Sequence, residues 1–439
     1  MDNILVIRGM FAHSTEKDPL VILPDHVIGV ANGKIIFFDD ANELDRHLES
    51  NGCTNVPVRK LDKGQFVIPG FIDTHIHAPQ YPNSGKGLDV GLLVWLEKYT
   101  FPTEAKFKDL KFAEHVYDRA VRRVVRNGTT TACYYGTIHT DASLVLCDII
   151  EKYGQRAFVG KVNMNQHSPE YYIETTEESI ENTERFITEV MKRKNGRIYP
   201  IITPRFAASC DHKLMASLAE MANNKNVHVQ THISETKGEI EWIGNLYPEE
   251  DHYVDVYDKA GLLGKKTILA HGIYLTPAER EIVKSRGCGI SHCPNSNTSI
   301  RSGVCDVRQL LEDGIPVGLG TDCSGGYSTS MQDAMRCSLH VSNFHAIQNE
   351  IVHISHKEAF MMATLGGAKV VNLEDTIGNF EVGKKFDALV VDVHTDESQI
   401  DIFEDDTIDD MFQKFIYLGN EQNFTEIYID GQDVMKLLS

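Results

Sequence analysis

Eight short apolar stretches alternate with longer amphipathic segments along most of this chain, and this alternation constrains the fold more than any other feature. The apolar stretches cover residues 66–76, 129–136, 157–163, 199–206, 227–234, 267–272, 287–292 and 316–321. Between them, stretches such as 112–126, 179–194 and 213–223 repeat apolar residues every three or four positions, which predicts helices. Strands that alternate with helices favour parallel βα units, and eight units close a (β/α)₈ barrel. We therefore predict an α/β protein with a TIM-like barrel over residues 67–376.

The two ends of the chain have a different sequence pattern: residues 1–66 and 377–439 contain mainly strand-like stretches. In the first segment Asn32-Gly33 separates two apolar runs, which is a strong signal for a β-hairpin. In the second, residues 386–393 and 426–431 have strand character. Since both segments flank the barrel, we expect them to join in one small β-sandwich domain.

The charge of the chain argues against several classes of partner. The chain has 43 Lys and Arg residues and 63 Asp and Glu residues. Its net charge of −20 repels phosphate backbones and anionic membrane surfaces. No window reaches the roughly 18 apolar residues of a membrane span, and the first residues do not resemble a signal peptide. We expect a cytoplasmic protein with no nucleic-acid or membrane partner. The acidic run at 401–410 is interpreted as a solvated loop, with a docking patch for a basic partner as the alternative.

A candidate metal centre is indicated where the predicted strands end. The motif Asp73-Thr-His75-Ile-His77 closes the first apolar stretch, and residues two apart in a strand face the same side. Further candidate ligands end later predicted strands: His232, His271 and Asp322. Active sites of barrels lie at this end of the strands. The recurrence predicts one shared metal site, although any single histidine could instead belong to the core.

Imidazole and carboxylate ligands suit Zn²⁺, which lowers the pKa of a bound water to about 7 when one coordination position is open. Three histidines, one aspartate and a water would complete such a site, and a fourth histidine could hold the water or the leaving group. Glu235 follows His232 by three residues, where a carboxylate can shuttle protons during a hydrolytic deamination. The fourth strand ends Thr203-Pro-Arg205-Phe206, without a lysine that could be carbamylated to bridge two metals. One zinc ion per chain is therefore expected.

Several sequence blocks, in their order along the chain, resemble the amidohydrolase superfamily and, within it, the guanine deaminase family. The blocks are residues 69–81, 95–102, 127–134, 203–206, 291–297 and 318–327. The His-x-His and Gly-Thr-Asp elements are shared by many amidohydrolases. His-Ala-Pro-Gln-Tyr at 77–81 and Thr-Pro-Arg-Phe at 203–206 are the parts that point to guanine.

The resemblance implies specific roles for residues of this chain. The implied zinc ligands are His75, His77, His232 and Asp322. The implied catalytic residues are Glu235 as proton shuttle, His271 beside the attacking water, and Asp322. The implied guanine contacts are His77, Ala78, Pro79, Gln80, Arg205, Phe206, His232, Glu235 and Asp322. Arg205 would bind the guanine carbonyl oxygen, since arginine offers only donors, with a structural ion pair as the alternative.

The implied reaction is the hydrolytic deamination of guanine to xanthine and ammonia, in a homodimer. A related amidohydrolase that acts on another aminated or halogenated heterocycle, such as a pterin or a triazine, is the alternative within enzymes. A scaffold protein that keeps the barrel without the chemistry is the alternative outside them. The intact set of candidate site residues argues against the scaffold.

Overall fold

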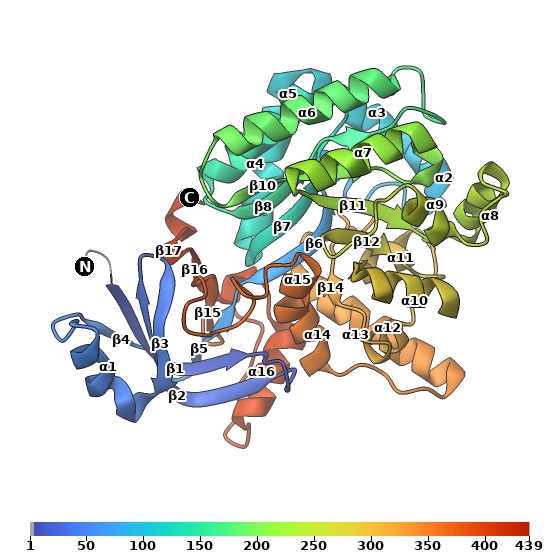
Figure 1. Ribbon diagram of the computed structural model, residues 1–439. Coiled ribbons are helices and arrows are strands. Elements are labelled where there is room, and N and C mark those ends of the chain that lie inside the picture. The colour runs from blue at the N-terminus through green and yellow to red at the C-terminus, as the bar shows by residue number, and fades with distance from the viewer. Residues whose placement is uncertain (1–3, 439) are drawn as a thin grey trace.

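Parallel strands wind into the barrel that the sequence predicts, in a computed structural model that describes residues 4–438 (Figure 1). Neighbouring strands pair in the order of the chain, and the third position is filled by two consecutive short strands. The strands are β6 (Phe71–His77), β7 (Thr129–Tyr135), β8 (Arg156–Gly160), β9 (Val162–Asn163), β10 (Ile198–Pro204), β11 (His228–Ile233), β12 (Thr267–His271), β13 (Gly289–His292) and β14 (Val317–Leu319). Nearly all their residues are buried, which is why each appears in the sequence as an apolar run.

The barrel closes where the residues after β14 meet β6. The backbone N–H of Asp322 donates to the carbonyl of His75 at 2.9 Å. The buried carboxylate of Asp73 accepts hydrogen bonds from the backbone N–H and the hydroxyl of Thr321 at 3.0 and 2.5 Å. This closure brings the carboxyl end of the first strand next to the segment that follows the last one.

Helices cover the outside of the barrel, and the main hydrophobic core lies between the two layers (Figure 1). The helices of this part are α2 (Leu92–Trp95), α3 (Phe101–Glu104), α4 (Leu110–Arg126), α5 (Thr140–Lys152), α6 (Thr176–Lys192), α7 (His212–Lys225), α8 (Lys237–Leu246), α9 (Tyr253–Lys259), α10 (Pro277–Arg286), α11 (Pro294–Ser299), α12 (Val307–Glu312), α13 (Met331–Asn349), α14 (His356–Ala363) and α15 (Leu365–Val370). The helices predicted at 112–126, 179–194 and 213–223 correspond to α4, α6 and α7. Asp109 caps α4 by accepting from the N–H of Lys111, which explains where that helix begins.

The N- and C-terminal segments share one small sheet beside the barrel, as expected (Figure 1). Its strands follow one continuous hydrogen-bonded path, with β4 attached to β1. The strands are β1 (Ile4–His13), β2 (Val21–Ala31), β3 (Lys34–Asp40), β4 (Val58–Lys60), β5 (Gln65–Pro69), β15 (Ala388–Asp392), β16 (Phe424–Ile429) and β17 (Gln432–Asp433). Asn32 and Gly33 turn the predicted hairpin with φ of 51° and 76°, as a type I′ turn requires. Helices α1 (Leu44–Ser50) and α16 (Ile408–Leu418) pack on this part.

The prediction of a single strand over residues 66–76 is wrong. The chain leaves the small sheet at the end of β5 and enters the barrel at the start of β6, so two strands of different sheets follow each other. Gly70 separates them, and a Cβ atom there would lie 2.1 Å from the Thr130 hydroxyl oxygen. Two adjacent apolar strands with one glycine between them look like a single long strand in the sequence.

The acidic run at 401–410 is only in part a loop. Residues 401–406 have no regular structure, whereas α16 begins at Ile408. Thr407 caps this helix in a capping box with Asp410. Negative side chains favour the N-terminus of a helix, because its free N–H groups carry partial positive charge. The last acidic residues of the run therefore stabilise a helix start.

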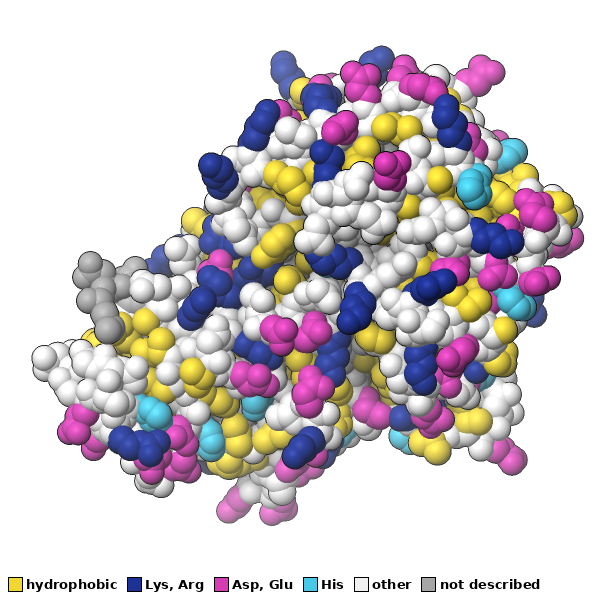
Figure 2. Space-filling view, in the orientation of Figure 1, with side chains coloured by type: hydrophobic (Ala, Val, Ile, Leu, Met, Phe, Trp, Pro, Cys, Tyr) yellow, Lys and Arg dark blue, Asp and Glu magenta, His cyan; other side chains and the backbone are white. Residues whose placement is uncertain are grey.

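The surface carries mixed charges on the face shown in Figure 2, where Lys and Arg are interspersed with Asp and Glu. Hydrophobic side chains are scattered among them on the same face. Among the helices of residues 4–438, none combines the length and apolar character that crossing a bilayer requires.

A buried ion pair joins the barrel to the small sheet. Arg156, which is 1% exposed, donates to both carboxylate oxygens of Asp387 at 3.0 and 3.2 Å and to Asp430 at 2.9 Å. We expect Arg156→Met to lower the free energy of unfolding by about 3–5 kcal/mol, since the buried Asp387 loses its cation. Urea denaturation measures this loss. Arg185→Met, which breaks an exposed pair with Asp141, should cost less than about 1 kcal/mol, and an equal loss in both variants would contradict the expectation.

Candidate active site

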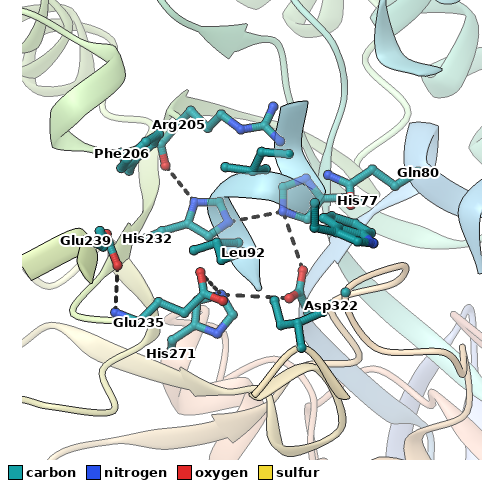
Figure 3. A pocket seen from close by; sticks show the side chains of 14 residues that line it. His77, Gln80, Leu92, Arg205, Phe206, His232, Glu235, Glu239, His271 and Asp322 are labelled. Carbon is teal, nitrogen blue, oxygen red and sulfur yellow. Dashed lines mark hydrogen bonds and ion pairs between the residues drawn. The ribbon is translucent and has the colours of Figure 1, made fainter. Parts of the chain in front are cut away.

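Four histidines and one aspartate meet at the carboxyl end of the barrel strands. His75 and His77 lie on β6, His232 on β11 and His271 at the end of β12, and Asp322 follows β14. Two overlapping groups of these residues have potential ligand atoms within 4.8 Å of one another: His75 with His232 and His271, and His75 with His77 and Asp322. Figure 3 shows the side chains of His77, His232, His271 and Asp322 directed at a common centre. The structure therefore brings together every ligand candidate that the sequence identified.

Hydrogen bonds at the outer ring nitrogens leave lone pairs directed at this centre. His75 Nδ1 lies 3.1 Å from the side-chain oxygen of Gln230, and His232 Nδ1 lies 2.6 Å from the backbone oxygen of Arg205. Both oxygens only accept, so each Nδ1 carries the proton and each Nε2 keeps a lone pair. The Nε2 atoms of His77 and His232 lie 3.1 Å apart, and the buried His75 Nε2 has no hydrogen-bond partner among the described residues. The unpaired Nε2 of His75, next to the two close Nε2 atoms of His77 and His232, fits a bound cation.

Asp322 supplies the negative charge of the cluster. One carboxylate oxygen lies 3.3 Å from His75 Nε2 and 3.6 Å from His77 Nε2, and the other lies 3.8 Å from His271 Nε2. Burial raises the pKa of Asp322, whereas positive charge on the neighbouring His75, His271 and His77 rings would hold it well below its usual range. Three imidazoles with one anionic oxygen form a donor set that a divalent metal ion binds.

Glu235 lies beside the cluster, in the turn between β11 and α8. One of its carboxylate oxygens lies 3.5 Å from His271 Nε2, and the other accepts from the Ser302 hydroxyl at 2.8 Å. Burial first, and the charge of Asp322 second, raise the pKa of Glu235 to about 8, which a bound cation would lower. The Glu239 carboxylate accepts from the backbone N–H of Glu235 at 2.9 Å and so fixes the turn. Glu235 is thus a buried, oriented carboxyl group able to exchange protons.

The backbone itself holds the site in uncommon conformations. Ser234, His271 and Asp322 have φ angles of 49°, 73° and 43°, in the left-handed region that non-glycine residues rarely adopt. Each such residue costs about 1–3 kcal/mol and persists only where its surroundings impose it. The Asn297 side-chain oxygen, 2.8 Å from His271 Nδ1, is one such constraint on the histidine. The surrounding structure therefore holds these three residues in place at some expense of local stability.

A pocket with about 460 Å³ of empty space, part of it open to solvent, adjoins the histidine–aspartate cluster (Figure 3). Its polar lining includes Gln80, Arg205 and Glu235. Its walls also contain apolar and aromatic side chains: Leu92, Trp95, Leu96, Phe206 and Ile300. A mostly apolar cavity with a few convergent polar groups suits a flat heterocycle.

The remaining predicted substrate contacts lie close to this pocket. Ala78 and Pro79 are buried in the short helical turn η2 (Ala78–Asn83), which continues β6 and carries Gln80. They are not among the residues that line the pocket. Their contact with a substrate stays a prediction.

Glu104 was missed by the sequence analysis. This fully buried residue at the end of α3 accepts from the Arg205 guanidinium at 2.8 and 3.2 Å and from the Gln80 amide at 2.9 Å. Tyr172 donates its hydroxyl to the same carboxylate at 2.7 Å. The ion pair considered as the alternative for Arg205 therefore exists, but an arginine has five N–H donors and can also face a ligand. Glu104 stands between Thr103 and Ala105 in the sequence, and no local pattern there marks it as a site residue.

Known proteins resemble this chain over nearly its whole length. Residues 66–434 match the Amidohydrolase family. The guanine deaminase of Pongo abelii is 48% identical over 443 residues, which cover 99% of this chain and 97% of that protein. The guanine deaminase of Mus musculus is 48% identical over 444 residues, with 99% and 97% covered.

A solved structure agrees with this relationship. The guanine deaminase from C. acetobutylicum, solved with bound guanine in the active site, superposes with a TM-score of 0.91 at 34% identity, over 98% of this chain and 100% of that one. The similarity extends over the small sheet as well as the barrel, since nearly all of both chains is covered. This chain belongs to the amidohydrolase family.

Proposed function

We propose that this protein hydrolyses guanine to xanthine and ammonia. The observation that carries the proposal is one pocket that joins a cluster of metal-ligand type to a buried carboxyl group, Glu235, and to a donor for a carbonyl group, Arg205. The near full-length similarity to guanine deaminases supports the same substrate. A cytoplasmic location and a homodimer stay predictions from the sequence.

Zinc, at one ion per chain, is the metal that we propose. His75, His77, His232 and Asp322 would hold it, because imidazole nitrogen and carboxylate oxygen are its usual ligands in catalytic sites. A zinc ion in this position would supply the Lewis acidity that makes water nucleophilic near neutral pH.

The side chains divide the remaining work of the reaction. Asp322 accepts a hydrogen bond from the attacking water, and His271 lies beside that water, so that its oxygen is aimed at C2 of guanine. Glu235 takes a proton from that water and delivers it to the ring nitrogen N3. The new C–O bond forms at C2. The second proton of the attacking water then passes to the amino nitrogen, the bond from C2 to that nitrogen breaks, and ammonia leaves. Arg205 donates to the carbonyl oxygen on C6 and fixes the orientation of the ring.

A product assay with a panel of substrates tests this proposal. We expect the purified protein to release ammonia and xanthine in equal amounts from guanine. Ammonia from a pterin or a triazine, with none from guanine, would favour a related amidohydrolase. Zinc-loaded protein without activity on any of them would favour the scaffold.

A further inference from the structure

One carboxylate, that of Glu104, organises the polar part of the pocket wall that Gln80 and Arg205 form. Glu104 Oε1 accepts from both Gln80 Nε2 and Arg205 Nη2, at 2.9 and 3.2 Å, so these two groups lie side by side. Its second oxygen accepts from Arg205 Nη1 and from the Tyr172 hydroxyl, at 2.8 and 2.7 Å. The ring of Phe101 lies below the guanidinium, with the central carbon 5.2 Å from the ring centre. All donors that reach Glu104 are thereby fixed in direction.

The chemistry of Glu104 decides which end of the Gln80 amide faces a ligand. An ionised carboxylate only accepts, so Gln80 must turn its NH₂ group toward it. The side-chain oxygen of Gln80, which accepts no hydrogen bond among the described residues, is the group left for a ligand. Arg205 keeps N–H donors beyond the two used by Glu104. The wall therefore presents an acceptor beside a donor.

We infer that Glu104 is the positioning residue that sets the specificity of this site, because it imposes an acceptor–donor pattern complementary to the lactam edge of a 6-oxopurine. That edge presents the N1–H donor beside the C6 carbonyl acceptor. The inference rests on the proposed function and deepens it. Adenine offers the reverse pattern, an N1 acceptor beside an amino donor. Its N1 acceptor would oppose the Gln80 oxygen, and its amino donor would oppose the Arg205 N–H groups.

This pattern makes a prediction about ligands that the enzyme does not convert. Hypoxanthine carries the lactam edge but has no amino group at C2, so it binds without reacting. We expect the zinc-loaded wild-type protein to bind hypoxanthine about 100-fold more tightly than adenine or better, because buried groups left unpaired reject an analogue strongly. Isothermal titration calorimetry measures the ratio of the two dissociation constants.

Glu104→Gln is the variant that tests the role of the carboxylate. A glutamine at this position both donates and accepts, so the Gln80 amide is free to turn over and Arg205 loses its anion. We expect the ratio of hypoxanthine to adenine affinity to fall by about 10-fold or more, with the zinc content unchanged. Glu104→Asp, which keeps the charge, should retain more of the preference than Glu104→Gln. An unchanged ratio in Glu104→Gln would overturn the inference.

Two further variants separate specificity from folding. Tyr172→Phe keeps the ion pair and removes one donor to Glu104, so the ratio should fall several-fold in a protein that stays folded. If Glu104→Gln does not fold, an unchanged ratio in Tyr172→Phe overturns the inference. Glu174→Gln is the matched control, because this buried carboxylate pairs with Lys161 and does not line the pocket. It should leave the ratio unchanged, and a fall equal to that of Glu104→Gln would contradict a specific role.

Failure of the proposed function gives a different result from failure of this inference. If the wild-type protein releases no xanthine from guanine, the proposed reaction is wrong whatever the affinities are. If it does release xanthine while Glu104→Gln keeps the full preference for hypoxanthine over adenine, the proposed reaction is supported and only the role of Glu104 is contradicted.

Discussion

Glu235→Gln is expected to lower kcat for guanine by about 10²- to 10⁴-fold, the usual contribution of a general acid–base group. The amide can still accept the hydrogen bond of Ser302, so the side chain keeps its place, but it cannot carry a proton between water and the ring. Zinc content and guanine binding should stay close to those of the wild type, because Glu235 is not among the groups of potential metal ligands. Steady-state kinetics at saturating guanine and elemental analysis of the same sample measure both.

Glu241→Gln provides the matched control for this prediction. It makes the same substitution on α8, six residues further along the chain, where the side chain is exposed. Its kcat should equal that of the wild type. If Glu235→Gln also turned over at nearly the normal rate, the proton shuttle would have to be another residue, with Asp322 the next candidate.

Arg205→Ala is expected to lower kcat/KM for guanine by roughly 10⁴-fold or more, because a pocket built around a hydrogen bond depends on it far more than on an apolar contact. Arg205 follows β10, which carries none of the proposed metal ligands, but its backbone oxygen contacts the His232 ring. Since the substitution keeps that backbone, zinc content should be unaffected. An unchanged kcat/KM would contradict the assignment of this pocket to guanine. Only membership of the amidohydrolase family would then be supported.

The loss in Arg205→Ala has a second component that the structure reveals. The substitution leaves the carboxylate of Glu104 buried without its cation, and breaking a buried pair costs about 3–5 kcal/mol of stability. The double variant Glu104→Gln/Arg205→Met removes both charges together and should recover much of the melting temperature. It should not recover kcat/KM, because the donor to the guanine carbonyl is still absent. Recovery of both would mean that Arg205 acts through stability alone.

Much of the barrel and its cluster of candidate metal ligands could be predicted from the sequence, because both have a local signature. A parallel strand buried on both faces is an apolar run, and a side chain needed at its carboxyl end stands at the end of that run, as His232 and His271 do. The strand break at Gly70 escaped notice because it depends on a contact with Thr130, sixty residues away, rather than on a local pattern.

The polar network around the site could not be predicted for the same reason. Glu104 contacts Arg205, which lies 101 residues further along the chain, and His75 contacts Gln230, which lies 155 residues further along. Nothing local marks a glutamate or a glutamine as the partner of such a distant side chain. The resemblance to a known family implied residues that would touch a ligand, but it did not imply the residues that orient them.

Guanine turnover measured against the zinc bound per chain tests the central claim of this account most directly. Metal-free protein is expected to be inactive, and turnover should rise in proportion to bound zinc and stop rising at one ion per chain. His75→Ala, which removes a proposed ligand, should neither retain zinc nor regain activity. Full turnover in the metal-free protein, or a requirement for two ions per chain, would contradict the account.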